Sequence, residues 1–412
     1  MPRHKSCRER ECFDAPRRLD SMRGTPLEVF LVFLKLGLTA FGGPIAHLAY
    51  FQRELIARRQ WITESAYGDL VALCQFLPGP ASSQVAFALG YLRAGIGGAF
   101  AAAVAFSSPS AILMIVIAYG FQAVGAQAGF LHGLRLAAVA VVAQAVWTMA
   151  RRLCPDRERV TLAIVAACFV IGSSMPWLQL VVIASGALLG WVLFRAKTDL
   201  GETLLEEKGL RGGWFAWANI ALFFILLAGL PLLSSGFTTH WLRLADAFYR
   251  SGALVFGGGH VILPLLQSET VYRGWLDQNA FMAGYGAAQA LPGPLFTFSA
   301  YLGTVIGHSW LAGLWCLLWI FLPSFLLILG ALPFWSKLRQ NAHAQAALRG
   351  ANAAVVGILL AALYNPVWIV AVDSSASLVI ALAAFDLLQF WKWPPWLIVV
   401  LSGTAGFLFL RP

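Results

Sequence analysis

The sequence predicts an all-α polytopic membrane protein built from an inverted-topology internal repeat with broken, re-entrant helical hairpins. Its composition gives the first indication, since 59% of the 412 residues are hydrophobic, 12% are charged, and the mean hydropathy is +0.73. Soluble domains carry about 25% charged residues. Apolar runs long enough to cross a hydrocarbon core of about 30 Å recur along the chain. The third observation is that short motifs occur twice at a nearly constant separation.

The repeat is defined by two motifs and several single landmarks. LPGP occurs at Leu77–Pro80 and again at Leu291–Pro294, a shift of 214 residues. FGG occurs at Phe41–Gly43 and at Phe256–Gly258, a shift of 215. The shift of 214 also relates Trp61 to Trp275, Pro109-Ser110 to Pro323-Ser324, and Leu134-Arg135 to Leu348-Arg349. Self-similarity sustained through so many landmarks indicates two copies of one structural unit.

The repeat divides the chain into four parts. We expect a disordered basic cytoplasmic arm over 1–25, a first repeat over 26–198, a linker with one extra transmembrane span over 199–242, and a second repeat over 243–410. The first 25 residues are charged and lack the apolar core of a signal peptide.

Each repeat predicts the same order of elements. A Gly/Pro-broken pair of short helices surrounds FGG, and a second broken pair surrounds LPGP. Four ordinary spans follow, near 97–120, 131–150, 160–176 and 178–195 in the first repeat, and near 310–332, 346–365, 374–391 and 396–410 in the second. The linker adds a span near 214–233, so we expect between about 9 and about 13 crossings, depending on whether the hairpins span fully.

The odd extra span inverts the second repeat relative to the first. The basic residues favour this reading, because positive charge collects in cytoplasmic loops. The residues expected on the cytoplasmic side of the first repeat are Arg53, Arg58, Arg59, Arg93, Arg151, Arg152, Arg157, Arg159, Arg195 and Lys197. The loops of the second repeat are poorer in positive charge. An inverted repeat with a cytoplasmic N-terminus is a common architecture of secondary transporters.

The broken helices are the predicted substrate site. Freed backbone groups survive at membrane depth only inside protein or beside a polar cavity, and a helix N-terminus favours an anion. Alternatively, the breaks are simple kinks, with Ser83 and Thr297 as caps. The predicted substrate-binding residues are Lys35, Phe41, Gly42, Gly43, Pro44, Gln75, Pro78, Gly79, Pro80, Ser82, Ser83, Arg250, Gly257, Gly258, Gly259, Gln289, Pro292, Gly293, Pro294 and Thr297.

Cations at equivalent positions support an anionic substrate. Lys35 and Arg250 each lie six residues before an FGG motif, and Arg135 is equivalent to Arg349. An ionised residue within a membrane helix costs at least about 2.5 kcal/mol, so a compensating anion is expected. One alternative is that these side chains extend to the membrane–water interface. Another is that they form ion pairs with Glu54 and Glu269, which occupy equivalent positions in the two repeats.

Titratable residues near the motifs are candidates for proton coupling. They are His47, Glu54, Asp69, His260 and Glu269. Histidine titrates near neutrality, although a single histidine is more often a hydrogen-bonded packing residue. The acids can equally be charges at helix starts.

Other functional classes find little support in the sequence. The six cysteines form no CxxC pair, and we expect no metal site and no cofactor. The net charge of +10 is explained by loops beside apolar spans, so no nucleic-acid partner is expected. An enzyme would need a nucleophile–base set or a ligand cluster, and His47 with Glu54 is only a weak candidate. The expected partners are an oxyanion, protons and the lipid bilayer; the sequence leaves a homodimer open.

Both halves of the sequence resemble the chromate ion transporter family. The segments that carry the resemblance are FLKLGLTAFGGPIAHLAYF, QFLPGPASSQ, FGGGHVILPLL and QALPGPLFTFSAYLG, within residues 26–410. The resemblance implies a long-chain, two-domain protein of the bacterial inner membrane that exports chromate, coupled to the proton-motive force. The two copies differ, because FGGP becomes FGGG and Gln84 aligns with Phe298. Sulfate or another oxyanion, or a passive anion channel, remain alternatives.

Overall fold

The computed structural model describes residues 24–124, 128–172, 178–194, 213–236, 239–256, 259–335, 338 and 341–410. Every regular element within these ranges is helical, which confirms the predicted fold class. The predicted basic arm lies, except for its last two residues, outside the described residues, as does the charged part of the linker.

The helices of the first repeat follow one another as α1 (Pro26–Thr39), α2 (Gly43–Phe51) with a π-helical turn η2 (Gln52–Arg58), α3 (Glu64–Phe76), α4 (Ala81–Val124), α5 (Ala128–Leu153), α6 (Arg157–Ile171) and α7 (Leu178–Leu193). Thr25 caps α1 with its side chain, and Pro26 occupies the first helical turn. The FGGP and LPGP motifs occupy the breaks before α2 and α4, as predicted.

The second repeat follows the linker helix α8 (Trp214–Gly236) and has the same order. It comprises α9 (His240–Ala253), the 3₁₀ turn η3 (Gly259–Val261), α10 (Ile262–Thr270), α11 (Gln278–Ala290), the 3₁₀ turn η4 (Leu295–Thr297), α12 (Phe298–Gly307), α13 (Trp310–Ala331) with η5 (Leu332–Phe334), α15 (Ala342–Ala362) with η6 (Leu363–Trp368) and α16 (Ile369–Ala371), α17 (Ser375–Gln389) and α18 (Pro395–Phe409). The elements of the two repeats correspond one to one.

Backbone geometry at single residues repeats as well. Gly79 and Gly293, at the equivalent place in the two LPGP motifs, have left-handed φ angles of 126° and 100°. The kink that divides α4 lies at Ala94 and Gly95, where the second repeat divides α12 from α13 at His308. The internal repeat therefore extends from sequence landmarks to individual dihedral angles.

The lengths of the helices correct part of the prediction. Within the described ranges, five helical segments are long and apolar enough to cross a membrane. These segments lie along α4, α5, α8, α13 and α15. By contrast, α6, α7, α17 and α18 have 15, 16, 15 and 15 residues, fewer than the roughly 20 that a full span requires. Only two of the four spans predicted in each repeat are therefore long enough, within the described residues, to cross a membrane fully.

Local capping sets the ends of three of these four helices. Asp156 accepts the first hydrogen bond of α6 from Arg159 N–H, and Gly172 ends that helix. Ser374 caps α17 in the same way. Pro395 opens α18 after a non-helical segment. The length of an apolar stretch in the sequence indicates how much of the chain is buried. The first and last residues of the helix within it are set by the capping residues.

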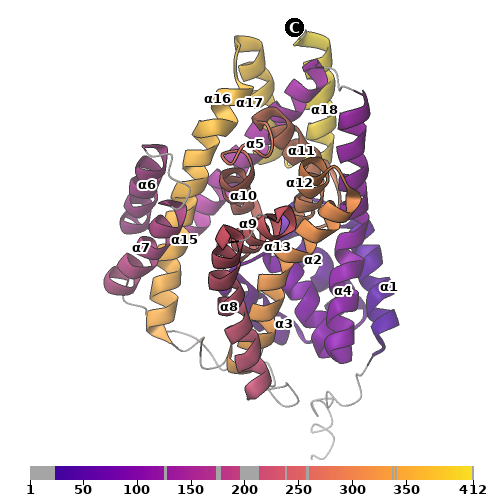
Figure 1. Ribbon diagram of the computed structural model, residues 1–412, viewed down its shortest axis with the longest axis vertical. Coiled ribbons are helices and arrows are strands. Elements are labelled where there is room, and N and C mark those ends of the chain that lie inside the picture. The colour runs from indigo at the N-terminus through magenta and orange to yellow at the C-terminus, as the bar shows by residue number, and fades with distance from the viewer. Residues whose placement is uncertain are drawn as a thin grey trace, which may run out of the picture.

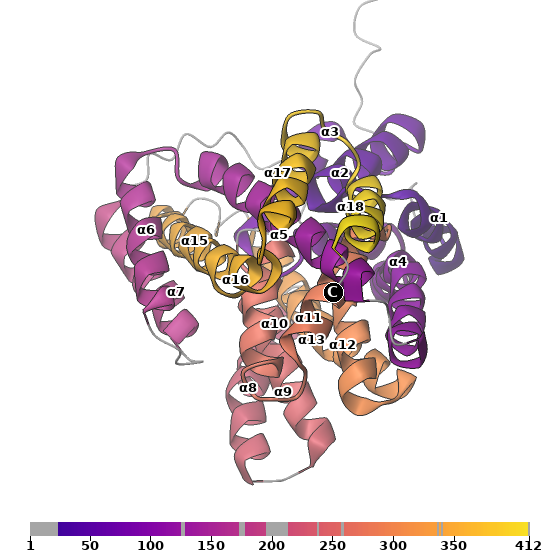
Figure 2. The same cartoon turned by 90° about the horizontal axis from the view of Figure 1, so that it is seen from above.

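The short helices pack on the opposite repeat. α6 and α7 lie against α15, while α17 and α18 lie against α5 (Figures 1 and 2). Glycines permit the close approach of α7 to α15, since a Cβ on Gly350 would lie 2.0 Å from the carbonyl oxygen of Gly186. α5 and α15 are thus each covered by two short helices from the other half of the chain, so the two repeats pack closely together.

Replacing Gly350 with alanine is expected to destabilise the protein by about 1–3 kcal/mol, because the added methyl group would force α7 away from α15. Gly229→Ala in α8 is the matched control, since a Cβ there meets no atom within 4 Å. Thermal unfolding of the two purified variants in detergent measures the difference. Equal melting temperatures would contradict the packing described here.

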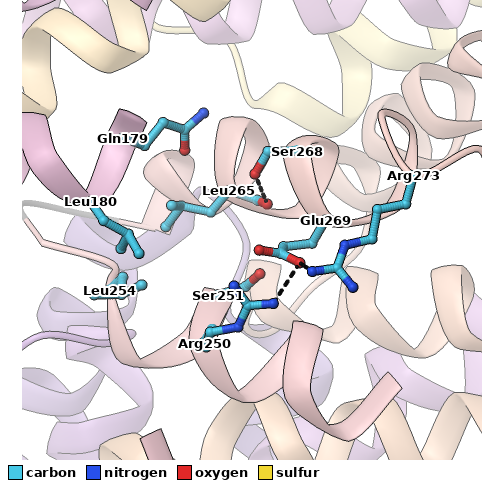
Figure 3. A pocket seen from close by; sticks show the side chains of 9 residues that line it. All are labelled: Gln179, Leu180, Arg250, Ser251, Leu254, Leu265, Ser268, Glu269 and Arg273. Atoms are coloured by element: carbon cyan, nitrogen blue, oxygen red, sulfur yellow. Dashed lines mark hydrogen bonds and ion pairs between the residues drawn. The ribbon is translucent and has the colours of Figure 1, made fainter. Parts of the chain in front are cut away.

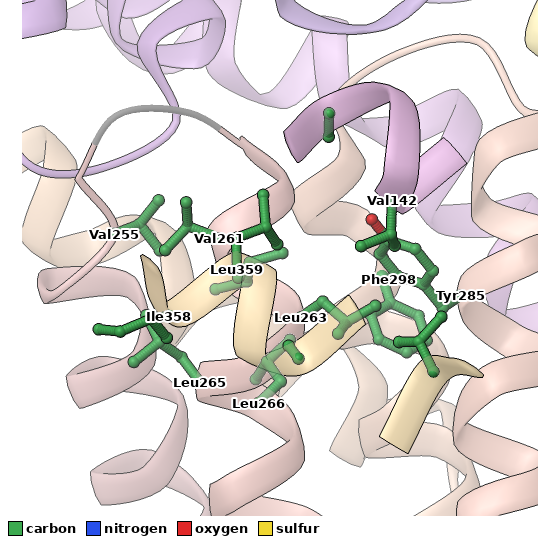
Figure 4. Close-up of a cluster of buried hydrophobic side chains, with 14 of the residues drawn as sticks. Val142, Val255, Val261, Leu263, Leu265, Leu266, Tyr285, Phe298, Ile358 and Leu359 are labelled. Carbon is green, nitrogen blue, oxygen red and sulfur yellow. The ribbon is translucent and has the colours of Figure 1, made fainter. Parts of the chain in front are cut away.

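The largest apolar cluster joins both repeats. Figure 4 shows side chains from α5, α10, α11, α12 and α15 that meet in it, among them Val142, Tyr285 and Phe298. Tyr285 and Phe298 are buried, and their rings meet edge to face with centroids 5.7 Å apart. This cluster holds the interrupted segments of the second repeat in a fixed position.

Candidate functional site

The two repeats meet at their helix breaks through a reciprocal pair of hydrogen bonds. The N–H of Gly79 in the first LPGP motif donates to the carbonyl of Val255, just before the second FGG motif, at 2.6 Å. The N–H of Gly293 in the second LPGP motif donates to the carbonyl of Ala40, just before the first FGG motif, at 3.0 Å. The sequence predicted both breaks, and the structure shows that each LPGP motif rests on the opposite repeat.

Each LPGP glycine also faces the Pro-Ser motif of the opposite repeat. A Cβ on Gly79 would lie 2.2 Å from Ser324 Oγ and 2.7 Å from Gln84 Nε2. A Cβ on Gly293 would lie 2.8 Å from Ser110 Oγ. A side chain has no room at either position, and the left-handed φ angles are a second reason for glycine.

The FGG segments lie close to each other in the same region. Gly42 precedes α2 with a φ of 99°, which ends α1 sharply and redirects the chain. Pro44 lies beside Gly259, since a Cβ on that glycine would be 3.4 Å from Pro44 Cγ. The predicted site residues Gly257 and Gly258 lie outside the described residues.

Unpartnered polar atoms collect at the first LPGP break. Ser83 Oγ, Gln84 Oε1 and Ser324 Oγ have no hydrogen-bond partner, and all three residues are buried. Gln84 is anchored at its other end, where Nε2 donates to the carbonyl of Pro78 at 2.8 Å. Buried polar groups almost always have partners. The N-terminus of α4, with its free N–H groups, therefore carries an unmet capacity for hydrogen bonding.

At the second LPGP break, the equivalent hydroxyl groups have hydrogen-bond partners. Thr297 Oγ1 donates to the carbonyl of Pro294 at 2.8 Å, and Ser110 Oγ donates to that of Ser107 at 3.2 Å. Phe298 stands where the first repeat has Gln84, and its ring is buried. Thr297 occupies the N-cap position of α12, but its hydroxyl donates to a carbonyl and accepts no hydrogen bond from a helix N–H, while Ser83 Oγ is unpartnered.

His47 connects the two breaks of the first repeat. Its Nε2 lies 3.2 Å from the carbonyl oxygen of Ala40, which also accepts from Gly293, and its Nδ1 lies 3.3 Å from Ser82 Oγ. His260 has a different partner, because its Nδ1 lies 3.0 Å from the hydroxyl of Tyr285. Each histidine is held by hydrogen bonds, as expected for a packing residue, and His47 alone lies against an LPGP segment.

Two of the four predicted cations, Lys35 and Arg250, have carboxylate partners, whereas Arg135 donates to Asn279 Oδ1 at 2.7 Å. Lys35 Nζ lies 3.8 Å from Glu54, and the lysine side chain is 54% exposed. Arg250 is held much more tightly, with 2.7 and 2.8 Å hydrogen bonds to the two oxygens of Asp246 and a 3.0 Å bond to Glu269. The pairing alternative weighed from the sequence is therefore present in both repeats, although the two clusters differ greatly in burial.

In each cluster the glutamate also binds an arginine, and these two arginines occupy equivalent positions in the two repeats. Arg58 contacts Glu54 at 3.3 Å, and Arg273 contacts Glu269 at 2.7 Å. A cavity of about 230 Å³ lies beside the second cluster (Figure 3). Arg250, Glu269 and Arg273 line it together with residues of α7, α9 and α10.

The other predicted site residues have contacts of their own or belong to the backbone of the FGG and LPGP motifs. Gln75 accepts a 2.7 Å hydrogen bond from Arg152. Asp69 is buried in α3. Gln289 Nε2 is unpartnered at the end of α11. Phe41, Gly43, Pro80 and Pro292 belong to the broken backbone itself.

Sequence reasoning missed several polar residues at the site. They are Ser324, Asp246, Arg273 and Gln179. Two signals could have found some of them: Asp246 lies four residues before Arg250, at ion-pair spacing, and the shift of 215 that relates Glu54 to Glu269 also relates Arg58 to Arg273. Ser324 belonged to a recognised landmark but had not been considered as a site residue.

Comparison with known proteins identifies the family. The family model described as "Chromate transporter" matches this chain twice, over residues 27–191 and 242–407. The chain belongs to the chromate transporter family. The two matches fall on the two repeats, so each repeat corresponds to one copy of the family's unit.

Two curated relatives align over nearly the whole chain, and a third aligns over part of it. A chromate transport protein of Pseudomonas aeruginosa is 28% identical, with 92% of both chains covered. An uncharacterized transporter of Methanocaldococcus jannaschii is 27% identical, over 93% of this chain and 94% of its own. A shorter uncharacterized transporter of Bacillus subtilis is 25% identical over 167 residues, which are 40% of this chain and 85% of that one. No solved structure matches this chain.

Proposed function

We propose that this protein is a secondary active transporter that exports chromate, a tetrahedral oxodianion, across the bacterial inner membrane, driven by the proton-motive force. Family membership and the nearly full-length similarity to chromate transport proteins support the substrate class. Broken helices in corresponding positions of two repeats are typical of a transporter's substrate site. The chain then acts as a transporter and not as an enzyme.

The observation that carries this proposal is the group of unpartnered atoms at the first LPGP break. Ser83 and Gln84 lie in the first turn of α4, and Ser324 comes from the other repeat; Gln84 and Ser324 both lie next to Gly79. A tetrahedral oxyanion offers several acceptor oxygens, which hydroxyl groups and free N–H groups of a helix N-terminus can bind. Because the two repeats contact each other there, a movement of one against the other would open the site to alternate sides of the membrane.

The proposed topology places the N-terminus in the cytoplasm. The linker helix α8 adds a single crossing between the repeats, which inverts the second relative to the first. The positively charged loops of the first repeat then face the cytoplasm. This arrangement makes the two LPGP breaks approach each other from opposite directions.

Everted membrane vesicles test the proposed function. We expect uptake of chromate that sulfate competes against and that an uncoupler abolishes, since the driving force is the proton-motive force. Vesicles without the protein are the control. Chromate uptake that is driven by an imposed membrane potential without any accompanying movement of protons would indicate a channel. A preference for sulfate over chromate would indicate a transporter of another oxyanion.

A further inference from the structure

The cavity beside Arg250 is charged, and its charges are balanced internally. Arg250 Nη2 and Arg273 Nη2 reach the same oxygen of Glu269, at 3.0 and 2.7 Å. Asp246 binds the other side of Arg250 with both carboxylate oxygens. With two guanidinium groups and two carboxylates in their usual ionised states, this cluster has no net charge.

The surroundings of Glu269 come from four elements. α9 contributes Asp246 and Arg250, and the segment after α10 contributes Arg273. Ser234 of α8 lies 3.3 Å from Asp246 and adds a donor to that carboxylate. From α7, Gln179 lines the cavity with an unpartnered Oε1, and the residue is 9% exposed. Glu269 is the carboxylate that lies between the two arginines.

An added oxyanion and an ionised Glu269 would compete for the same guanidinium groups. A dianion next to two carboxylates is strongly disfavoured at low effective dielectric. If Glu269 takes up a proton, the cluster gains one positive charge, and the N–H groups of Arg250 and Arg273 that now bind Glu269 become free donors. A cavity of about 230 Å³ has room for a tetrahedral oxyanion.

We propose that this cavity is a second oxyanion site, which binds its anion when Glu269 is protonated. The inference rests on the proposed function, because it assigns the proton-coupling group of the same transporter. A proton from solvent adds to the Glu269 carboxylate, the two arginine hydrogen bonds to it break, and both guanidinium groups then donate to the oxyanion. Asp246 keeps its charge and holds Arg250 in place through the bidentate contact.

The equivalent cluster of the first repeat is less suited to this role. Glu54 is bound by Lys35, Arg58 and Arg59, whose side chains are 54%, 65% and 33% exposed, whereas the side chain of Arg250 is 19% exposed. Solvent and salt screen exposed pairs, so protonating Glu54 would change the binding of an anion only weakly. The cavity of about 230 Å³ lies beside the second cluster, with Gln179 and Leu180 of the first repeat also in its lining.

A direction of coupling follows from the site. Because the proton and the oxyanion occupy it together, they move in the same direction through the membrane. One proton with a dianion carries a single net negative charge, so outward transport is favoured by a membrane potential that is negative inside. The electrical part of the proton-motive force would then drive export.

Equilibrium binding of radiolabelled sulfate to the purified full-length protein tests this proposal. Sulfate keeps the same charge between mildly acidic and mildly alkaline pH, so any pH dependence belongs to the protein. We expect wild-type affinity to increase as the pH falls. Glu269→Gln should bind sulfate at least about tenfold more tightly at neutral pH, with no pH dependence, since it mimics the protonated acid.

Two further variants keep the test specific. Glu269→Asp should retain the pH dependence, and Glu158→Gln, an exposed acid of α6, should behave as wild type. Thermal unfolding of each variant shows whether it is folded. If Glu269→Gln binds sulfate with the wild-type pH dependence, the assignment of Glu269 is wrong while oxyanion transport stands. If wild type neither binds sulfate nor transports chromate in vesicles, both this inference and the proposed function fail.

Discussion

Replacing Gly79 with alanine is expected to abolish oxyanion transport and to destabilise the protein by about 2–5 kcal/mol. The new methyl group would lie 2.2 Å from Ser324 Oγ, and the φ of 126° is unfavourable for any residue with a Cβ. The substitution thus separates the two repeats at the hydrogen bond from Gly79 to Val255. Vesicle uptake and thermal unfolding measure the two effects.

Two variants separate the loss of space at Gly79 from the strained backbone. Gly95 has a φ of 64° and a ψ of −155°, a region that residues with a Cβ rarely adopt, but a Cβ there meets no atom within 4 Å, so Gly95→Ala should cost about 1–3 kcal/mol through the backbone alone and retain transport. Adding Ser324→Gly to Gly79→Ala removes the closest clash and should recover part of the lost stability. If Gly79→Ala is no more damaging than Gly95→Ala, the contact between the repeats is not tight.

Replacing Arg250 with alanine is the second change with a large expected effect. It would leave Asp246 and Glu269, which are 3% and 10% exposed, without the cation that binds both of them. Breaking a buried pair by removing one partner typically costs about 3–5 kcal/mol. We expect low recovery of the folded protein and no transport by the remaining fraction, measured by size-exclusion chromatography and vesicle uptake.

Lys35→Ala is the matched control in the first repeat. Lys35 is more than half exposed and its contact with Glu54 is 3.8 Å long, so its loss should cost less than about 1 kcal/mol. Arg250→Lys should recover little, because lysine cannot bind Asp246 with two parallel hydrogen bonds. Equal losses of stability in Lys35→Ala and Arg250→Ala would contradict the difference in burial between the two clusters.

Most of the fold was predictable because the chain contains the same unit twice. A constant shift shows which residues are equivalent, and Gly/Pro motifs show where helices must break. The helices before and after FGG and LPGP, and the extra helix α8, were found in this way. The exact starts of α6 and α17 were not, since Asp156 and Ser374 begin these helices by capping, which hydropathy does not report.

The site was predictable only in part for a related reason. A repeat identifies equivalent residues but not which of them touch, so the contacts of Gly79 with Val255 and Ser324 were not foreseen. The expectation that Lys35 and Arg250 serve substrate stays a prediction, because both have carboxylate partners here. The difference between Gln84 and Phe298 was visible in the sequence and coincides with the difference in unpartnered polar atoms.

Chromate uptake by proteoliposomes that contain only the purified protein tests the central claim most directly. The claim is that the oxyanion binds where the first LPGP break meets Ser324. We predict that Ser324→Ala lowers uptake severely, since it removes an unpartnered hydroxyl, and that Ser110→Ala, whose hydroxyl already donates to the carbonyl of Ser107, has a much smaller effect. Equal uptake by the two variants, or none by wild type, would contradict the account.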